Sequence, residues 1–382
     1  MLLPGATLGM LGGGQLGRMF TIAARNMGYE VVVLDPDPDS PAGMLASDHV
    51  CADYLDTTAL QYLSETCDAI TTEFENVPAE SLEYLAEHCD VRPGARAVTL
   101  TQDRISEKTF LHDNGFATAP FAVIREPADL DAAARAVPTP AILKIARFGY
   151  DGKGQYPVAS GEELADAWQE LGNNPCVLEQ RVDLDLEISV VVARGIDGET
   201  RCYPVAENVH RHGILDVSLV PARIDTDLEQ QVLQAATAIA GTLDYVGVLA
   251  VEFFVSHGEL LVNEIAPRPH NSGHYTLDAT LTSQFEQQVR AVCGLPLGDP
   301  RLLSPVVMIN LLGDLWQGQT PPDWRPLFAR ANAKLHLYGK REARVGRKMG
   351  HYNVLAPTLD EALQTAQAIQ QQLARAEVTR DE

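Results

Sequence analysis

Apolar and polar positions alternate with two different periods along residues 7–90. Short apolar runs that predict strands occur in TLGMLG, YEVVVLD and CDAITTEF, and a stretch with helical spacing occurs in QLGRMFTIAARNMG. Strands that are separated by helices are typical of a parallel, doubly wound sheet. The pattern therefore predicts an α/β domain in the first part of the chain.

The pattern changes after VRPGARAV, where proline and glycine mark a break. Strand-like runs then occur in AILKIA, PCVLEQ and LEISVVVAR, and GEELADAWQELG is helical. VGVLAVEFFVSHGELLVNEIA predicts a β-hairpin with its turn near His257–Gly258, because glycine accepts the backbone angles of a tight turn. After the linker GLPLGDPRLLSP, strand-like pieces from about Val306 lead to a polar helix. We predict a mixed α/β and α+β fold with three domains, residues 1–98, 99–298 and 299–382.

Composition narrows the classes of function. The 52 acidic residues outnumber the 29 Lys and Arg residues, and the net charge of −23 makes nucleic acid and anionic membranes poor partners. An anionic substrate would need a local positive site. No apolar run reaches the length of about 18 residues that a membrane helix needs, and the first residues lack the basic segment of a signal peptide. Six cysteines without C-x-x-C spacing predict a cytoplasmic protein with neither a zinc site nor a disulfide framework.

A glycine-rich turn follows the first predicted strand. Gly12, Gly14 and Gly17 match G-x-G-x-x-G, where small residues let a phosphate approach the N–H groups at a helix start. Asp35 ends the next strand, near the place where a dinucleotide-binding acid would lie. The motif alone is weak, so an NAD site, another anion site and a turn without a ligand all stay open.

A second glycine-rich loop follows Lys144, which ends an otherwise apolar strand where a charge needs a reason. The sequence GYDGKGQ places three glycines, Asp151 and Lys153 directly after it. A lysine on a strand beside such a loop can bind nucleotide phosphates, as in kinases of a different fold. The alternative is a charged strand end before an ordinary turn.

PCVLEQRVDLDLEISV contributes two glutamates at a predicted hinge between strands. Its backbone could bind the edge of an adenine, and Glu179 or Glu187 could accept the hydrogen bonds of ribose hydroxyl groups. A solvated strand end explains the same residues equally well.

The predicted hairpin carries the strongest local chemistry. Its turn places Glu252 opposite Asn263 or Glu264, depending on the loop length. Two carboxylates that face each other on an apolar sheet repel unless a cation lies between them, and oxygen-only ligands favour Mg²⁺. The alternative is that one glutamate faces solvent.

Two further segments are dense in polar groups. Residues 267–274, PRPHNSGH, directly follow the predicted metal site and are stiffened by prolines. Residues 334–351 hold six basic side chains and one acid, a positive island in an acidic chain. A solvated loop is one explanation of this island, and a phosphate site is the sharper one, because arginine matches phosphate oxygens with two hydrogen bonds.

Together these motifs resemble the ATP-grasp enzymes, and among them closely the N5-carboxyaminoimidazole ribonucleotide synthetases of purine biosynthesis. The resemblance runs through nearly the whole chain and rests on GGGQLGRM, TEFENVP, GYDGKGQ, PVAEN, NEIAPRPHNSGHYT, SQFEQ and GRKMGH with the preceding YGK. It implies an ATP-grasp fold with an N-terminal doubly wound parallel-sheet domain and a small C-terminal domain, usually in a homodimer. The implied reaction joins ATP, bicarbonate and 5-aminoimidazole ribonucleotide through carboxyphosphate, with Mg²⁺ or alternatively Mn²⁺.

The resemblance also implies roles for individual residues. The implied ATP contacts are Arg104, Lys144, Gly149, Tyr150, Asp151, Gly152, Lys153, Gly154, Gln155, Glu179, Gln180, Arg181, Val182, Glu187, His210, Asn263 and Glu264. The implied ribonucleotide contacts are Gly14, Gln15, Leu16, Glu73, Asn76, Tyr150, Lys153, His270, Asn271, Lys340 and Arg347. The implied carboxylation centre holds Asp151, Lys153, His270 and Asn271, and the implied metal ligands are Glu252 and Glu264. Lys153 stands where some members of the family carry arginine. The resemblance also implies that the glycine turn Gly12–Gly17 helps to bind the phosphate of the substrate.

Three other functions compete with this interpretation. A related ATP-grasp enzyme that transfers formate to a ribonucleotide would share the ATP and magnesium residues, although HNSGHYT favours the carboxylating enzyme. An NAD-dependent dehydrogenase is supported only by the Gly12–Gly17 turn and Asp35. A non-catalytic nucleotide sensor would have no need for both Glu252 and Glu264.

Overall fold

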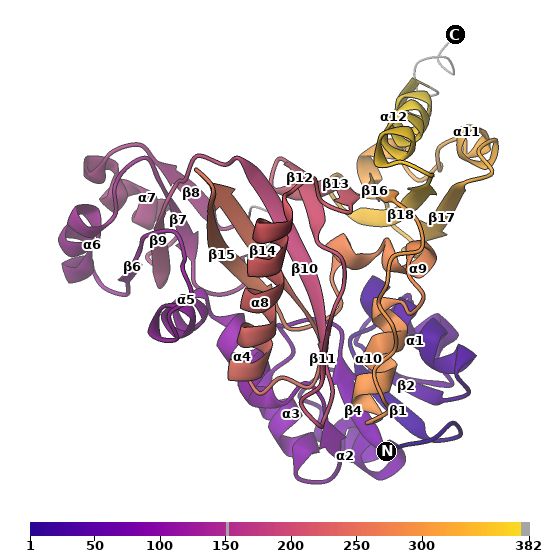
Figure 1. Ribbon diagram of the computed structural model, residues 1–382. Coiled ribbons are helices and arrows are strands. Elements are labelled where there is room, and N and C mark those ends of the chain that lie inside the picture. The colour runs from indigo at the N-terminus through magenta and orange to yellow at the C-terminus, as the bar shows by residue number, and fades with distance from the viewer. Residues whose placement is uncertain (150–152, 376–382) are drawn as a thin grey trace.

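The structure is a computed structural model that describes residues 1–149 and 153–375. The N-terminal part is a five-stranded parallel sheet in the order β3-β2-β1-β4-β5, with helices packed around it (Figure 1). Its strands are β1 (Thr7–Leu11), β2 (Glu30–Leu34), β3 (Asp48–Val50), β4 (Ala69–Thr72) and β5 (Asp90–Val91). Its helices are α1 (Gln15–Asn26), α2 (Thr57–Thr66), α3 (Ala79–Ala86) and α4 (Ala95–Gln102), with a 3₁₀ turn at Gly43–Leu45. The predicted doubly wound α/β domain is confirmed.

The second part is a small antiparallel sheet in the order β6-β9-β7-β8. Its strands are β6 (Phe121–Ile124), β7 (Ala141–Ile145), β8 (Gln155–Val158) and β9 (Cys176–Gln180). The helices beside it are α5 (Arg104–Asp113), α6 (Leu130–Ala136) and α7 (Leu164–Glu170), with 3₁₀ turns at Pro127–Asp129 and Gly161–Glu163. Apolar side chains of α6 and α7, among them Ala133 and Trp168, pack into one cluster with the sheet. This packing forms a separate lobe of the molecule (Figure 1).

The largest sheet has nine strands in the order β15-β14-β10-β12-β13-β16-β18-β17, with β11 beside β10. Its strands are β10 (Leu186–Arg194), β11 (Thr200–Cys202), β12 (Ala206–Arg211), β13 (Ile214–Val220), β14 (Gly247–Ser256), β15 (Glu259–Ala266), β16 (Val306–Leu312), β17 (Ala333–Leu337) and β18 (Lys348–Leu355). Its helices are α8 (Thr226–Thr242), α9 (Thr276–Ala279), α10 (Gln284–Val292), α11 (Arg325–Phe328) and α12 (Leu359–Arg375), with 3₁₀ turns at Asn271–Gly273 and Gly313–Leu315. β16 pairs with β13, so the last part of the chain continues the central sheet rather than forming a separate one. The domain limits at 98 and 298 stay a prediction.

The β14–β15 hairpin settles the register that the sequence left open. The two-residue turn has positive φ at both His257 (51°) and Gly258 (76°), and Ser256 pairs with Glu259. Without an irregularity, this turn would pair Glu252 with Asn263. A β-bulge next to Glu252 shifts the pairing by one residue, so that Glu252 lies opposite Glu264.

Helix α10 joins the parts of the molecule. Phe285 and Val289 lie in one buried cluster with Phe20 of α1 and with Tyr338, which follows β17. Gln288 is buried and bridges two sheets, because its amide donates to Thr71 Oγ1 at 2.8 Å and accepts the N–H of Val248 at 2.5 Å. The active-site segments before α10 therefore rest on a rigid junction.

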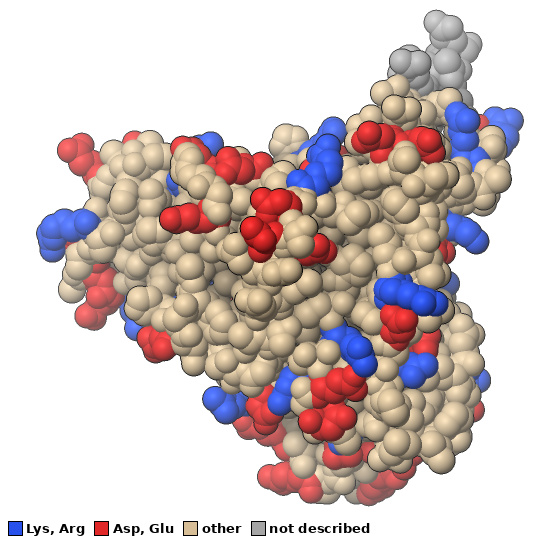
Figure 2. All heavy atoms as spheres, viewed as in Figure 1, with Lys and Arg blue, Asp and Glu red and all other residues tan. Residues whose placement is uncertain are grey.

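Charged side chains of both signs lie on the surface of the protein. On the face shown in Figure 2, acidic and basic side chains are interspersed between uncharged residues. Within residues 1–149 and 153–375, none of the helices is long and apolar enough to cross a membrane.

Candidate active site

A buried cluster of opposite charges lies where the small sheet faces α5. Glu179 of β9 is 2% exposed, and its two carboxylate oxygens lie 3.1 Å from Lys144 Nζ and 3.4 Å from Lys108 Nζ. Burial alone would raise the pKa of Glu179, but the two lysines outweigh it and hold that pKa below its usual value. Burial lowers the pKa of Lys144, and the negative charge of Glu179 partly offsets this lowering. The predicted charge on the apolar strand β7 therefore has a partner already in place.

The glycine-rich loop leaves β7 beside this cluster. Tyr150, Asp151 and Gly152 lie outside the described residues. On the near side, Phe148 takes a positive φ of 64° and is 66% exposed, with the Arg147 guanidinium 5.5 Å from its ring centre. On the far side, Lys153 is exposed, Gly154 has φ of 70°, and Gln155 pairs with Lys144.

The segment after β9 connects the small sheet with the large one. The Gln180 N–H donates to Pro120 O at 2.8 Å, and the Arg181 N–H donates to Pro140 O at 3.0 Å. Val182 is partly buried. At the start of β10, the Glu187 carboxylate lies 2.7 Å from His210 Nδ1. Burial alone would lower the pKa of His210, but the carboxylates of Glu187 and Glu252 raise it above its usual value.

The two predicted metal ligands lie on neighbouring strands of the large sheet. Because Glu252 pairs with Glu264, burial and the neighbouring charge raise the pKa of Glu252 to about 7. Asn263 Nδ2 lies 3.5 Å from a Glu252 oxygen, and Arg104 Nη1 lies 3.3 Å from a Glu264 oxygen. The oxygen-only pair fits Mg²⁺ or Mn²⁺, because these cations take one or two carboxylates together with substrate phosphates. Among the described residues, no group of three or more His, Cys, Asp or Glu side chains is arranged as a complete metal site.

Two residues of this region, Glu107 and Lys108, were not predicted from the sequence. Arg104, Glu107 and Lys108 lie on one face of α5, because their spacing of three and four residues matches a helical turn. Glu107 is buried and accepts the Ile265 N–H at 2.6 Å, and burial together with Glu264 raises its pKa to about 8. The signal was available in the sequence RISEK, but it needed the knowledge that Arg104 begins a helix facing the site.

His270 and Asn271 lie next to the metal ligands. His270 Nε2 is 3.4 Å from Glu252 Oε1, and the His270 side chain is 11% exposed. Asn271 exchanges two hydrogen bonds with Asn310 of β16, at 3.0 and 2.6 Å. The structure thus brings His270, one of the predicted carboxylation residues, to the predicted metal ligand Glu252, while Asp151 lies outside the described residues.

Carboxylates close the first glycine turn. The Gly14 and Gly17 N–H groups each donate to Glu73 at 2.6 Å, and the Gly13 N–H donates to Asp35 at 2.6 Å. Asp35 also accepts a hydrogen bond from the Tyr54 hydroxyl at 3.0 Å. Its carboxylate therefore stabilises the turn, which weighs against a role in binding the ribose of a dinucleotide. A phosphate at this turn would have to displace Glu73 or lie outside it, so the phosphate role of the turn stays a prediction.

The other predicted contacts near the turn differ in exposure. The Leu16 side chain is 8% exposed and packs in the core, and Gln15 is half-buried. Asn76 is half-buried in the loop after β4, where its neighbour Glu75 pairs with Arg268 at 2.6 Å. This ion pair ties the loop to the segment that carries His270.

The positive island of residues 334–351 is partly neutralised within the protein. Arg341 pairs with Asp39, and Arg344 pairs with Glu342. Lys340 Nζ donates to Lys348 O at 2.8 Å, and Arg347 Nη1 donates to Glu342 O at 2.9 Å. The charge of Lys340 also opposes the rise that burial causes in the pKa of Glu73. The structure thereby brings the island close to the first glycine turn.

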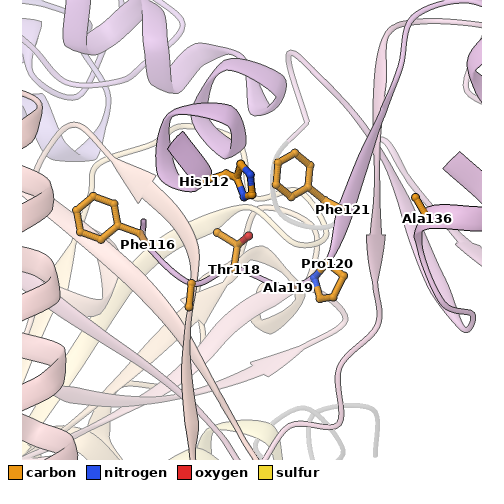
Figure 3. Close-up of a pocket in the computed structure, with 8 residues that line it drawn as sticks. His112, Phe116, Thr118, Ala119, Pro120, Phe121 and Ala136 are labelled. Carbon is orange, nitrogen blue, oxygen red and sulfur yellow. The ribbon is translucent and has the colours of Figure 1, made fainter. Parts of the chain in front are cut away.

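A cavity of about 430 Å³ lies beyond the C-terminal half of α5 (Figure 3). His112 and Phe121 stand side by side in it, with ring centres 6.2 Å apart. Phe116, the segment 117–120 and Ala136 complete the lining. None of the predicted site residues is among the described residues that line this cavity.

Three sequence profiles match successive parts of the chain. The ribonucleotide synthetase pre-ATP-grasp domain matches residues 5–102, the ATP-grasp domain matches residues 109–285, and the phosphoribosylaminoimidazole carboxylase C-terminal domain matches residues 306–365. The first profile covers the N-terminal sheet, the second covers the small sheet together with β10 to β15 of the large sheet, and the third covers β16 to β18.

Relatives and solved structures are similar over nearly the whole length. A Bacillus subtilis (strain 168) protein named N5-carboxyaminoimidazole ribonucleotide synthase is 44% identical over 366 residues, which is 95% of each chain. The ADP complex of an N5-carboxyaminoimidazole ribonucleotide synthetase has a TM-score of 0.92 at 43% identity, covering 97% of each chain. An Aspergillus clavatus N5-carboxyaminoimidazole synthase in complex with ADP and 5-aminoimidazole ribonucleotide has a TM-score of 0.88 at 31% identity, covering 97% of this chain and 99% of that chain.

Proposed function

The chain belongs to the N5-carboxyaminoimidazole ribonucleotide synthases of the ATP-grasp enzymes, and we propose that it uses ATP and bicarbonate to carboxylate 5-aminoimidazole ribonucleotide. The products are N5-carboxyaminoimidazole ribonucleotide, ADP and phosphate. The chain is thus an ATP-dependent ligase of purine biosynthesis. Its relatives carry that name, which leaves the formate-transferring alternative without support.

One observation carries the proposal: the ATP residues and the carboxylation residues form a continuous series of contacts. Arg104 contacts Glu264, Glu264 pairs with Glu252, and Glu252 lies 3.4 Å from His270. A phosphoryl group that leaves ATP between these residues would therefore be produced beside the acceptor site. A protein that only senses a nucleotide would have no need for the carboxylation residues beside the ATP site.

Buried charges suit the protein for phosphoryl transfer. The transition state carries charge on the phosphate oxygens, and fixed cations in a water-poor site stabilise it. Lys144 would contact the phosphates from β7, and the glycine loop with Lys153 would cover them. Arg104 would neutralise charge on the opposite side of the site. The hinge residues Glu179–Val182 would bind the adenine, and Glu187 the ribose.

Glu252 and Glu264 would hold Mg²⁺ or Mn²⁺, with Asn263 beside them. When bound, the cation would neutralise charge on the ATP phosphates. Two facing carboxylates, one with a raised pKa, are the features of this chain that call for it.

The acceptor needs an activated carboxyl group, because the carbon of bicarbonate is a poor electrophile. A bicarbonate oxygen attacks the γ-phosphorus of ATP and ADP leaves, which forms carboxyphosphate. The exocyclic amine of the ribonucleotide then attacks the carbonyl carbon, phosphate leaves with the C–O bond electrons, and the amine loses a proton. Carboxyphosphate hydrolyses readily, so His270 and Asn271, both nearly buried, suit a site that excludes water. Lys340 and Arg347 would bind the 5′-phosphate.

Oxygen labelling tests the proposal directly. Purified enzyme with ATP, the ribonucleotide and ¹⁸O-bicarbonate should release phosphate that contains one bicarbonate oxygen. ADP release should require bicarbonate and should rise when the ribonucleotide is added. Phosphate without the label, under conditions that exclude exchange with water, would rule out carboxyphosphate, and stimulation by formate in place of bicarbonate would point to the transformylase.

Location and assembly complete the proposal. All six cysteines are free thiols, which supports a cytoplasmic protein. We expect a homodimer, as in the family, and neither nucleic acid nor a membrane as a partner, given the net charge of −23. Sedimentation equilibrium of the purified protein measures the assembly.

A further inference from the structure

The imidazole of His270 is held from its Nδ1 side. The Ser272 backbone N–H donates to His270 Nδ1 at 3.3 Å, and the Ser272 hydroxyl oxygen lies 2.9 Å from the same nitrogen. A backbone amide can only donate, so Nδ1 must accept. The proton of a neutral His270 ring then belongs on Nε2, which faces Glu252.

A series of buried side chains continues from Ser272 across the large sheet. The Ser189 hydroxyl of β10 donates to Ser272 Oγ at 2.7 Å, and Asn208 Nδ2 of β12 donates to Ser189 Oγ at 2.8 Å. Ser218 of β13 donates to Asn208 Oδ1 at 2.8 Å. None of these side chains is more than 6% exposed. We call Ser218, Asn208, Ser189 and Ser272 the polar chain.

The polar chain has a direction that its chemistry imposes. Each hydroxyl has one hydrogen to donate, while the amide nitrogen of Asn208 has hydrogens only. Ser189 accepts from Asn208 and donates its own hydrogen to Ser272. Ser272 in turn has its hydrogen available for His270 Nδ1. Both contacts to Nδ1 thus supply a hydrogen and place the ring proton on Nε2.

The main chain of His270 is fixed independently. The side-chain amide of Gln284, which is fully buried at the start of α10, accepts the His270 N–H and donates to the His270 carbonyl, both at 2.8 Å. Gln284 therefore fixes the backbone of His270, and the contacts of Ser272 with Nδ1 orient the ring.

We propose that the polar chain positions His270 with its proton on Nε2, so that His270 meets the reacting carboxyl group as a hydrogen-bond donor. Its members are positioning residues, because they act through His270. The inference rests on the proposed function only in placing His270 at the reaction centre. The proton placement itself is a property of the protein without substrates.

Nitrogen NMR of ¹⁵N-histidine-labelled enzyme tests the proton placement. The two ring nitrogens of His270, assigned by comparison with His270→Gln, should show the pattern of the Nε2–H tautomer in the enzyme without ligands. A wild-type ring that carries its proton on Nδ1, or on both nitrogens, would overturn the proposal. This measurement does not depend on turnover, so it stands apart from the labelling test of the proposed function.

Asn208→Asp tests the role of the polar chain. The new carboxylate accepts only, so Ser189 would donate to it and Ser272 would donate to Ser189, which leaves the Ser272 oxygen to accept at His270. The tautomer should shift toward Nδ1–H, and kcat should fall about tenfold or more while the KM for ATP stays within about twofold. Ser272→Ala should give a smaller shift in the same direction, because its backbone N–H remains.

Ser81→Ala is the matched control. Ser81 is also fully buried and donates to a backbone carbonyl, Tyr54 O, at 2.7 Å, but it is not part of the polar chain. It should leave both the His270 tautomer and kcat unchanged. If Asn208→Asp and Ser272→Ala keep the wild-type tautomer, or if they lower kcat no more than Ser81→Ala does, the positioning role is wrong.

Discussion

Two carboxylates of the same site, one buried and one half-buried, lie in opposite electrostatic surroundings. Glu179 lies between Lys108 and Lys144, which hold its pKa below the usual value. Glu252 faces Glu264, and its pKa is raised to about 7. A buried charge is costly unless it is paired. The protein compensates the first carboxylate with its own lysines, and we propose that a cation compensates the second.

The difference separates residues that shape the site from residues that complete it only when substrates arrive. The Glu179 cluster is set before ATP binds, so it should govern the geometry of the nucleotide site. The carboxylates of Glu252 and Glu264 repel each other, and we expect a divalent cation to neutralise this repulsion. The pair should therefore govern metal binding and turnover. Five predictions test this division.

The largest effect is expected for Glu264→Gln. The amide keeps the shape but cannot match the charge of a cation, so turnover at ordinary magnesium concentration should fall roughly a thousandfold or more. ATP cleavage assays across a range of magnesium and manganese concentrations measure it. Normal activity with normal metal dependence would remove Glu264 from the metal site.

Lys144→Met should raise the KM for ATP about a hundredfold, because it removes a buried positive charge from the phosphate site. It also leaves Glu179 with one lysine, so the free energy of unfolding should fall by about 3 kcal/mol.

Lys108→Met sharpens this test, because Lys108 pairs with the other oxygen of the same carboxylate. It should cost similar stability and a smaller increase in the KM for ATP. Equal effects of the two variants on ATP binding would show that Lys144 acts only through Glu179. Calorimetric titration with ADP and urea unfolding provide the two readouts.

Arg347→Ala tests a partly exposed charge against the buried lysines. Water and salt screen surface charges, so the KM for the ribonucleotide should rise only about tenfold, and the rise should shrink at high ionic strength. The KM for ATP should stay nearly unchanged. If ATP binding suffers more, the positive island belongs to the nucleotide site.

The smallest effect is a change of stability with pH in the metal-free protein. Below about pH 7 the folded protein keeps a proton on Glu252, while the unfolded chain keeps it only below about pH 4.3. The folded state therefore holds more protons between these values, and its stability falls as pH rises toward 7. The Glu252→Gln variant has no such titrating proton. Its free energy of unfolding, relative to that of the wild type, should therefore rise by on the order of 1 kcal/mol between pH 5 and pH 8. Parallel melting curves in EDTA at both pH values would contradict the raised pKa.

Local patterns were sufficient for most of the fold. The parallel sheet with α1 between β1 and β2 follows from apolar runs that alternate with a helical period, and the β14–β15 hairpin follows from its two apolar strands around His257–Gly258. The continuity of β13 with β16 could not be predicted this way. Backbone pairing between strands that lie 86 or more positions apart leaves no local trace in the sequence.

The site was predictable in its residue types and less so in its pairings. Lys144 and Glu252 stood out because a charge within an apolar strand needs a partner. The partner of Lys144 was not visible, because Glu179 lies 35 positions away on a neighbouring strand, and its second lysine, Lys108, lies on helix α5. For Glu252, the sequence left Asn263 and Glu264 as alternatives. The carboxylate of Glu73 at the first glycine turn was likewise predicted to face the substrate, and only the fold shows that it accepts two N–H groups of that turn.

The sequence by itself determined the class of chemistry, because residue types and their spacing are local: glycine loops after strands, carboxylates on a hairpin, and a cluster of bases in an acidic chain. The tertiary structure alone decided which charges are compensated. The bulge beside Glu252 selects Glu264 rather than Asn263 as its opposite residue, and the packing of α5 gives Glu179 a second lysine. Electrostatic energy depends on distance and burial, and both are fixed only when distant segments pack together.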